Sequence, residues 1–306
     1  MNLLITGAWQ QANEYIAQIE KIHSVKFLAW EKDELPCNPV WVEGIIGNGI
    51  FLSHPIESFT NLRYIQLTSA GFDRVPMDYV KEHNIKICNA RGVYSIPMAE
   101  YALYSVLALY KKGRSFFENQ KCHLWEKERN LKELYGQTVC VFGCGSVGSE
   151  CAKRFEAMGC TVIGVDLFVR ENKCFTHIYH TDDSKEALEQ SDIVIITLPL
   201  TDETRHMFNQ NLFNVMKKDS VLVNIARGAL VDTDALIEAL GNKLYGAVLD
   251  VFEEEPLSES SPLWNMENVL VSPHNSFIGS GNGKRMSNVI MKNLEEYGMQ
   301  SMKEFA

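Results

Sequence analysis

A glycine-rich segment in the middle of the chain has the spacing of a phosphate-binding turn. It reads GCGSVG at residues 143–148, between a strand-like run at Thr138–Phe142 and a helix-like run at 147–158. A further strand-like run ends at Asp166, about 20 residues after the glycines, as the dinucleotide fingerprint requires. A glycine cluster alone is often only a tight turn. The strand, the helix and the distal acid together predict a dinucleotide site.

Each residue type in this segment has a physical reason. Gly143 permits a sharp strand-to-helix turn, Gly145 lets the backbone approach a pyrophosphate, and Gly148 lets the helix pack closely on the sheet. The helix N-terminus offers free N–H groups to the phosphates. The predicted contacts are Gly143, Gly145, Ser146, Val147 and Gly148. Asp166 would accept hydrogen bonds from ribose hydroxyls and repel a 2′-phosphate, which favours NAD over NADP; the alternative is an acid that caps the next turn.

An arginine, a glutamate and a histidine each follow a strand-like run in the second half of the chain. They are Arg227 in NIARGALVD, Glu255 in LDVFEEEPL and His274 in VSPHNSF. The preceding runs are residues 221–225, 245–251 and 269–272. Each residue alone would be unremarkable: a surface arginine, a solvated acidic loop or a structural histidine. Because ligands of open α/β sheets bind at the carboxyl ends of the strands, their shared placement predicts a functional site.

The elements that would position these residues form two α/β series. The strand-like runs are residues 3–6, 25–29, 44–46, 64–67 and 85–88, then 138–142, 161–165, 193–198, 221–225, 245–251 and 269–272. The helix-like runs include residues 16–22, 99–112, 147–158, 233–240 and 284–297. Strands that alternate with helices predict parallel sheets covered on both faces. The sequence therefore predicts an α/β fold with two doubly wound parallel-sheet domains.

Length and composition agree with this organisation and exclude several classes of protein. At roughly 150 residues per domain, 306 residues correspond to two domains, and 46% hydrophobic with 22% charged residues is ordinary for a globular protein. The net charge of −10 argues against nucleic acid as a partner. Eight scattered cysteines without a CxxC pair or a His–Cys spacing predict no metal site. The N-terminus lacks a signal-peptide pattern, and the apolar run at 99–110 is too short to span a membrane, so we expect a cytoplasmic protein.

Several longer segments resemble one enzyme family. They are SAGFDRV at residues 69–75, NARGVYSIPMAEYAL, ELYGQTVCVFGCGSVG, TLPLTDETRHMFN, LVNIARGALVD, LDVFEEEPL and VSPH. Together they are similar to the D-isomer-specific 2-hydroxyacid dehydrogenases, which include D-lactate dehydrogenases, D-3-phosphoglycerate dehydrogenases and glyoxylate/hydroxypyruvate reductases. The resemblance covers nearly the whole chain. It implies an NAD-dependent oxidoreductase that interconverts a small anionic 2-oxo acid and its D-2-hydroxy acid.

The resemblance also implies roles for individual residues. His274 would be the general acid that protonates the carbonyl oxygen, and the base in the reverse direction. Glu255 would hydrogen-bond its imidazole, and Arg227 would bind the substrate's carboxylate and carbonyl with its planar fork. The N–H groups of Ala70 and Gly71 would bind the same carboxylate. Negative charge develops on the carbonyl oxygen during reduction, so such positive donors favour the transition state.

The resemblance also implies which residues contact the cofactor and where the domains begin and end. Asp250 would lie near the nicotinamide carboxamide, and Leu198 and Pro199 along the adenosine. The remaining implied cofactor contacts are Ile225, Ala226, Arg227 and His274. A Rossmann NAD-binding domain, residues 98–277, would be inserted into a flavodoxin-like substrate domain made of residues 1–97 and 278–306. The segment around Trp125 resembles one used for homodimer contact through the NAD-binding domain; the alternative is an exposed charged linker.

Other interpretations remain open. Residues 275–277, Asn-Ser-Phe, depart from the small or aliphatic residues that many members carry after the histidine, so the substrate is not defined. D-3-phosphoglycerate dehydrogenase activity would need a basic cluster in the first domain. The candidates for that cluster are Arg63, Arg74 and Arg91. Formate dehydrogenase is disfavoured because Pro273 precedes His274 where glutamine is expected. A non-enzymatic NAD-sensing protein is an alternative of another class.

Overall fold

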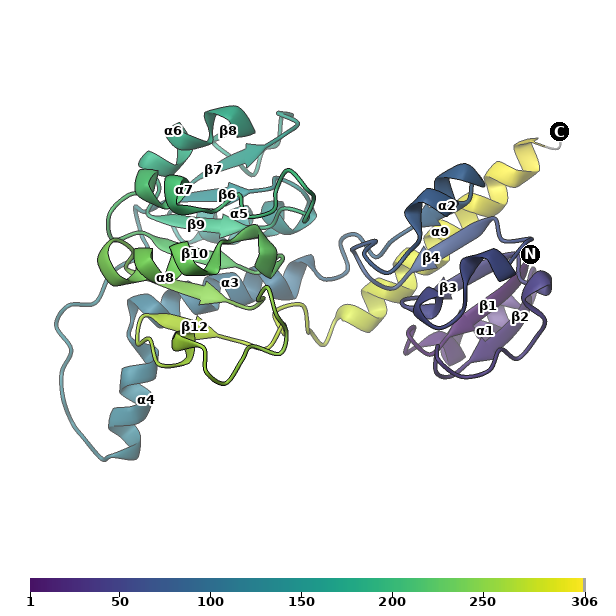
Figure 1. Ribbon diagram of the computed structural model, residues 1–306, viewed down its shortest axis with the longest axis horizontal. Helices are drawn as coiled ribbons and strands as arrows, with labels where there is room; N and C mark the ends of the chain where they lie inside the picture. Colours follow the sequence, from purple (N-terminus) through teal and green to yellow (C-terminus); the bar gives the residue numbers. More distant parts are fainter. Residues whose placement is uncertain (305–306) are drawn as a thin grey trace. The chain divides into compact units, whose positions relative to one another are not determined.

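The computed structural model describes residues 1–304, and the chain divides into two compact units. The smaller unit consists of Met1–Tyr94 and the C-terminal segment that begins at Gly279; the larger unit is Ser95–Ile278. Each unit is built around its own parallel sheet (Figure 1). The predicted α/β class with two parallel sheets is therefore confirmed.

The smaller unit has a five-stranded sheet in the order β2-β1-β3-β4-β5. The strands are β1 (Asn2–Thr6), β2 (Ser24–Leu28), β3 (Gly44–Gly47), β4 (Tyr64–Leu67) and β5 (Lys86–Cys88). All neighbours are parallel, with Leu4 opposite Ile45 and Ile45 opposite Ile65. This strand order is the flavodoxin-like one. β3 and β4 are buried along their whole length because both faces of the sheet are covered.

Helices cover the two faces of the smaller sheet. They are α1 (Ala12–Ile19), α2 (Met77–Glu82) and α9 (Asn282–Glu304), with short 3-10 turns η1 (Pro39–Trp41), η2 (Ile50–Leu52) and η3 (Ile56–Ser58). Met286, Ile290 and Leu294 lie one turn apart on α9 and are buried in the same cluster as residues of β1 and α1. The indole N–H of Trp9 donates to Ser287 Oγ at 3.0 Å. The C-terminal helix is thus part of this unit's core.

The larger unit has a seven-stranded sheet in the order β12-β11-β10-β9-β6-β7-β8. The strands are β6 (Thr138–Phe142), β7 (Thr161–Asp166), β8 (His177–His180), β9 (Ile193–Ile196), β10 (Val221–Asn224), β11 (Gly246–Leu249) and β12 (Val269–Val271). All pairs are parallel. The chain builds outward from β6 in one direction and then from β9 in the other, which is the Rossmann pattern.

Two apolar clusters, one on each face, hold helices against this sheet. The packed helices are α3 (Ser95–Tyr110), α5 (Ser146–Ala157), α6 (Ser184–Glu189), α7 (Gln210–Val215) and α8 (Thr233–Asn242), with η4 (Thr181–Asp183), η5 (Gly228–Leu230) and η6 (Pro262–Trp264) in the loops. A further helix, α4 (Gly113–Lys121), has no buried residue and lies outside both clusters. α8 begins at a side-chain cap, because Asp232 Oδ1 accepts from the Ala235 N–H at 3.1 Å. Among residues 1–304, no helix has the length and apolar character needed to cross a membrane.

The elements differ from the sequence-based expectations in several places; α1, for example, begins and ends earlier than the expected run at residues 16–22. The strand β8 was not expected, because HIYH is a polar, half-exposed edge strand without an apolar run. The helix α4 was not expected either; Lys112, at φ 49°, ends the apolar helix and a polar one follows. Several strands also end one or two residues earlier than predicted, since the residues that follow leave the sheet to form loops at its carboxyl edge.

Candidate functional site

The glycine-rich turn lies where the strand order of the larger sheet reverses. β6 pairs with β7 on one side and β9 on the other, and the chain passes from β6 into α5 through this turn. Gly143 has φ 95°, a conformation that side chains disfavour. The Thr197 hydroxyl, just after β9, donates to the carbonyl of Gly143 at 2.8 Å. Such a reversal point is where open α/β sheets bind ligands.

Gly145 and Gly148 have opposite surroundings. A Cβ atom on Gly145 would have no heavy atom within 4 Å, so the backbone is open on that side. A Cβ atom on Gly148 would lie 2.0 Å from the carbonyl oxygen of Gly143. Gly145 therefore leaves room for a ligand group, whereas Gly148 is needed for α5 to pack against the turn.

Asp166 lies beside this turn at the end of β7. Its Oδ2 accepts from the Cys144 N–H at 2.7 Å, and its Oδ1 accepts from the Phe168 N–H at 2.9 Å. Burial, with the charge of Asp166 as a second cause, raises the pKa of the Cys144 thiol to about 12, so this thiol is neutral at pH 7. An open backbone at a helix N-terminus with a carboxylate beside it is a set of groups that fits a dinucleotide.

Arg227 is held at the carboxyl end of β10 by a buried asparagine. Asn224, the last residue of β10, donates from Nδ2 to the Arg227 carbonyl at 2.9 Å and accepts from the Ala226 N–H at 3.1 Å. The guanidinium donates from Nη1 to the carbonyl of Ala226 at 2.7 Å. The residue after it, Gly228, touches the loop after β11: a Cβ there would lie 1.9 Å from the carbonyl carbon of Phe252. The arginine loop and the loop that carries Glu255 are therefore packed directly together.

His274 and Glu255 form a hydrogen-bonded pair. His274 Nδ1 lies 2.9 Å from Glu255 Oε2, and Glu255 Oε1 accepts from the Phe252 N–H at 3.0 Å. An ionised carboxylate only accepts hydrogen bonds, so Nδ1 carries the proton and Nε2 is left to act on another group. The Phe277 ring packs against the imidazole in a T-shaped arrangement, with the ring centroids 5.9 Å apart and the ring planes at 89°. The side chains of both partners are partly exposed.

A fully buried carboxylate organises the backbone around the histidine. Asp250 Oδ1 accepts from the Ser272 hydroxyl at 2.5 Å and from the Asn275 N–H at 2.8 Å, and Oδ2 accepts from the Ser276 N–H at 2.9 Å. The His274 N–H donates to the Asp250 carbonyl at 2.7 Å. His274 itself has φ 50°, a left-handed conformation that is rare for a residue with a side chain. These contacts hold the His274 backbone in that conformation and thereby position its imidazole.

The three predicted residues thus lie at one edge of the larger sheet. Arg227, Glu255 and His274 follow β10, β11 and β12, which are neighbours in the sheet. The other predicted cofactor positions in this unit lie in loops at the same edge. Ile225 and Ala226 are buried, Leu198 is half-buried, Pro199 is exposed, and Ser146 and Val147 begin α5. Sequence reasoning missed Asn224 and Ser272; a polar residue at or after the end of an apolar strand was the available signal.

In the smaller unit, Ala70 and Gly71 lie in the loop after β4. Asn89 Nδ2 donates to the Ala70 carbonyl at 2.6 Å, and the Ser69 hydroxyl donates to the Gly71 carbonyl at 3.0 Å. Within residues 1–304, neither the Ala70 nor the Gly71 N–H has a hydrogen-bond partner. Arg63 lies before β4, at the opposite end of the strand, and pairs with Glu43. The carbonyls of this loop are thus fixed while its amide groups are available.

No group of three or more His, Cys, Asp or Glu side chains in the described part of the chain is arranged to hold a metal ion. A cavity of about 630 Å³ is formed by α4 and the segment after it, residues 123–129. Its lining contains none of the residues that follow β10, β11 and β12. This cavity and the residues that follow β10, β11 and β12 are therefore separate features.

The fold and the turn define the larger unit as a Rossmann-type dinucleotide-binding domain. Residues 103–276 match the model of the "D-isomer specific 2-hydroxyacid dehydrogenase, NAD binding domain". The chain therefore belongs to the D-isomer specific 2-hydroxyacid dehydrogenase family, a family of NAD-dependent oxidoreductases, as the sequence motifs predict.

Individual relatives agree with this assignment. The chain is 35% identical over 222 residues, 72% of its length, to a D-3-phosphoglycerate dehydrogenase of Methanocaldococcus jannaschii, but the match spans only 42% of that protein. It is 32% identical over 252 residues to a glyoxylate reductase of Thermofilum pendens, covering 78% of this chain and 73% of that one. Among solved structures, a family protein from Aeromonas salmonicida has a TM-score of 0.83 at 26% identity, covering 97% and 95% of the two chains. A D-lactate dehydrogenase of Aquifex aeolicus, complexed with NAD and lactic acid, has a TM-score of 0.78 at 25% identity, covering 99% and 97%.

Proposed function

We propose that this chain is an NAD-dependent reductase of a small 2-oxo acid that forms the D-2-hydroxy acid, and that also catalyses the reverse reaction. The observation that carries the proposal is the His274–Glu255 pair, 2.9 Å apart, at the carboxyl edge of a dinucleotide-binding sheet. Family membership supports the reaction class. The small acids named for the glyoxylate reductase and D-lactate dehydrogenase relatives support the substrate class.

In this proposal the protein supplies a proton and a binding site for an anion. The nicotinamide, when bound, supplies or accepts the hydride. His274 donates a proton from Nε2 to the carbonyl oxygen of the 2-oxo acid, and Glu255 stabilises the imidazolium and fixes its orientation through Nδ1. Arg227 binds the substrate's carboxylate. In the smaller unit, the amide groups of Ala70 and Gly71, whose carbonyls are already fixed, are the proposed donors to an anionic group.

The cofactor would be held by the turn at residues 143–148 and by Asp166. The open face at Gly145 supports close approach of a pyrophosphate, and the carboxylate supports NAD over NADP. The other predicted contacts, Leu198, Pro199, Ile225, Ala226 and Asp250, remain part of the proposal. Asp250 is proposed to lie near the nicotinamide carboxamide, and its carboxylate already accepts three hydrogen bonds from the protein.

The proposal is tested by a spectrophotometric screen of the purified protein. Glyoxylate, hydroxypyruvate, pyruvate and a branched 2-oxo acid are offered with NADH and with NADPH. We expect NADH oxidation with at least one acid, and a product of D configuration on chiral analysis. Absence of turnover with every acid and both cofactors would contradict the proposal. Tight NADH binding without turnover would instead support the NAD-sensing alternative.

A phosphorylated substrate is a second candidate, supported by the D-3-phosphoglycerate dehydrogenase relatives. Of the three arginines considered for a phosphate, Arg63 is paired with Glu43 before β4. Arg74 and Arg91 follow β4 and β5, at the same edge of the smaller sheet as the Ala70–Gly71 amides. Phosphohydroxypyruvate therefore belongs in the same screen. A kcat/KM for it above that of every unphosphorylated acid would favour this candidate.

Asp166→Asn is expected to shift the cofactor preference toward NADPH. The amide oxygen of asparagine can still accept a hydrogen bond at the turn, while the charge that repels a 2′-phosphate is lost. We expect the NADPH/NADH ratio of kcat/KM to rise by about 10-fold, which corresponds to about 1.4 kcal/mol. Asp182→Asn, at an exposed carboxylate in the same unit, is the matched control and should leave the ratio unchanged. An unchanged ratio in Asp166→Asn would remove the basis for NAD preference.

Gly228→Ala is expected to disconnect the arginine loop from the glutamate loop. The new Cβ would lie 1.9 Å from Phe252 and 2.4 Å from the Glu253 N–H nitrogen, so the two loops must separate. Because a shift of about 1 Å can cost roughly 100-fold in rate, kcat/KM should fall by about that factor. Gly241→Ala in α8, where a Cβ meets nothing within 4 Å, is the control and should retain full activity. Wild-type kinetics for Gly228→Ala would mean that the packing of these two loops does not set the positions of Arg227 and Glu255.

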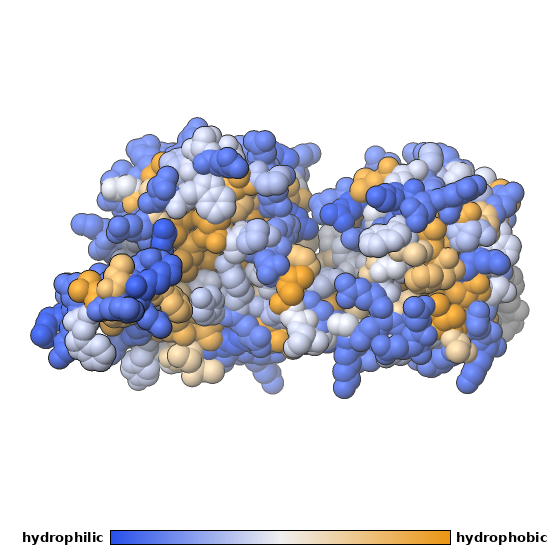
Figure 2. Space-filling model, turned by 90° about the horizontal axis from the view of Figure 1, so that it is seen from below, coloured by the Kyte–Doolittle hydropathy of each residue, from blue (hydrophilic) through white to orange (hydrophobic). Residues whose placement is uncertain are grey.

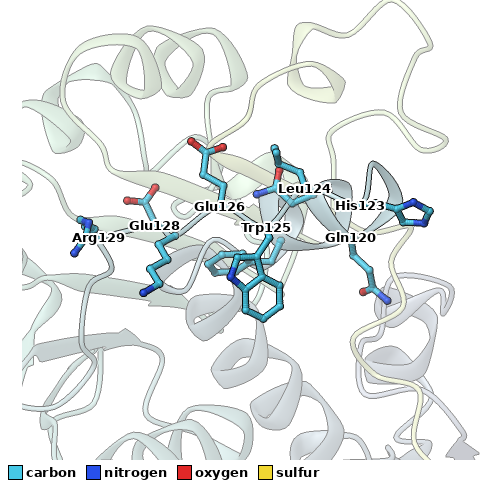
Figure 3. Close-up of a pocket in the computed structure, with 10 residues that line it drawn as sticks. Gln120, His123, Leu124, Trp125, Glu126, Glu128 and Arg129 are labelled. Atoms are coloured by element: carbon cyan, nitrogen blue, oxygen red, sulfur yellow. The ribbon is translucent and has the colours of Figure 1, made fainter.

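The segment at residues 123–129, which lines the cavity beside α4, supports the predicted homodimer through the NAD-binding domain. Trp125 is 95% exposed, and Leu124 beside it is also exposed. The segment is nevertheless anchored, by an ion pair of Lys112 with Glu128 at 2.5 Å and by Lys132 Nζ donating to the Asp219 carbonyl at 2.8 Å. Figure 3 shows the Trp125 indole projecting from this segment, and Figure 2 shows apolar patches among hydrophilic ones over the end of the larger unit that carries α4. Tryptophan is enriched among the residues that contribute most to protein–protein interfaces, so an exposed Trp125 on an anchored segment fits a contact with a second copy.

Trp125→Glu is therefore expected to convert a dimer to a monomer. A charge placed in the desolvated centre of an interface is strongly unfavourable. Light scattering after size-exclusion chromatography measures the mass. Ile22→Glu, at an exposed apolar residue of the smaller unit, is the control and should remain dimeric. A wild-type protein that is already monomeric would contradict the proposal.

The cytoplasmic location remains a prediction.

A further inference from the structure

One side chain from the start of the larger unit reaches the histidine loop through two consecutive hydrogen bonds. Tyr101, on α3, donates its hydroxyl to Ser272 Oγ at 2.6 Å. Ser272 donates in turn to Asp250 Oδ1 at 2.5 Å. Asp250 accepts from the Asn275 and Ser276 amides, which directly follow His274. The chain Tyr101–Ser272–Asp250 therefore connects α3 to the backbone that carries the imidazole.

We propose that Tyr101 is a positioning residue for His274. Its hydroxyl donates to Ser272, and it acts on the histidine loop through Ser272 and Asp250. The inference rests on the proposed function, because it assigns His274 the proton transfer.

The physical reason is the burial of the Asp250 carboxylate. This group is fully buried, and a buried charge is tolerated only where donors surround it. The Ser272 hydroxyl is one of its three donors, and a hydroxyl that accepts a hydrogen bond becomes a stronger donor itself. The Tyr101 hydroxyl supplies that hydrogen bond and also fixes the Ser272 rotamer. Burial raises the pKa of Tyr101, so the phenol stays protonated and able to donate.

His274 needs this support because of its backbone. At φ 50° it occupies a region that is unfavourable for a residue with a side chain, so its conformation depends on the loop around it. Without the Tyr101 hydroxyl, the Ser272 hydroxyl is free to rotate away from Asp250. The Asp250 carboxylate is then held less firmly, and its hydrogen bonds from the Asn275 and Ser276 amides weaken. The imidazole then samples orientations in which Nε2 is misdirected.

Tyr101→Phe tests this, because it removes one oxygen and keeps the ring. Tyr104→Phe is the matched control: it lies on the same helix, is exposed, and its ring is 6.4 Å from that of Tyr101. Two measurements are made on the full chain. One is steady-state kinetics with the preferred 2-oxo acid, and the other is amide hydrogen exchange of residues 272–277.

We expect Tyr101→Phe to lower kcat by about 10-fold with KM for both substrates within about twofold, because misorientation affects the proton transfer more than binding. Exchange of the Asn275 and Ser276 amides should accelerate. Tyr104→Phe should match the wild type in both measurements. Unchanged kcat and exchange in Tyr101→Phe would overturn the proposal. So would a general loss, in which KM rises and exchange accelerates throughout the larger unit, since Tyr101 would then be only structural.

The two proposals can fail separately. If the wild-type protein turns over no 2-oxo acid, the proposed reaction fails, but the exchange of residues 272–277 still reports whether Tyr101 anchors this loop. If the wild type is active and Tyr101→Phe is fully active too, the reaction stands and the positioning role is wrong.

Discussion

His274→Ala is expected to lower kcat for 2-oxo acid reduction by about 10²- to 10⁴-fold. The imidazole is the group placed to give a proton to the carbonyl oxygen, and loss of a general acid has an effect of this size. Its Nδ1 is held by Glu255 at 2.9 Å, which leaves Nε2 to carry out the transfer. The measurement is kcat under saturating NADH and 2-oxo acid, with single-turnover kinetics to separate chemistry from product release.

Two further variants show whether the loss has the proposed cause. Glu255→Gln should have a smaller effect, about 10-fold, because the amide oxygen can still accept from Nδ1 while the negative charge beside the imidazolium is lost. His180→Ala, at a partly exposed histidine on β8, should leave kcat unchanged. NADH should still bind His274→Ala, because the turn at residues 143–148 and Asp166 are unchanged in this variant. A His274→Ala enzyme that keeps more than about a tenth of wild-type kcat would require another proton donor.

The fold could be predicted to a large extent because its determinants are local. Parallel strands buried on both faces read as continuous apolar runs, and β4 and β6 have the bounds that the sequence predicts. β8 carries no such signal, since HIYH is an edge strand with half-exposed side chains. The start of α4 depends on the left-handed Lys112, which sequence propensity does not indicate.

The site could be predicted where chemistry follows directly after a strand. Arg227 and His274 stand within three residues of the strands β10 and β12, so the topology of a parallel sheet brings them to one edge. The residues that hold them could not be found in the same way. Tyr101 lies 171 residues before Ser272, and on α3 it reads as one more aromatic of an apolar helix. Its role depends on a hydrogen bond that exists only after packing.

Gly145→Val and Gly148→Val are expected to fail in different ways. At Gly145 the new side chain enters space that is empty within 4 Å of its Cβ, so the larger unit should fold with near wild-type stability. That space faces the turn where the pyrophosphate is proposed to lie, so the Kd for NADH should rise by at least about 100-fold, or 2.7 kcal/mol. Fluorescence titration with NADH and urea denaturation measure the two properties on the same sample.

At Gly148 the same substitution should damage the fold first. Its Cβ would lie 2.0 Å from the carbonyl oxygen of Gly143, a backbone atom that cannot move without displacing α5 or the turn. Overpacking of this kind costs about 3 kcal/mol, so the free energy of unfolding should fall by that amount or more. The contrast separates the two reasons for glycine in one motif: the first is clearance for a ligand and the second is clearance for a helix. Equal loss of stability in both variants would mean that Gly145 is also a packing residue, and unchanged NADH affinity in Gly145→Val would place the pyrophosphate elsewhere.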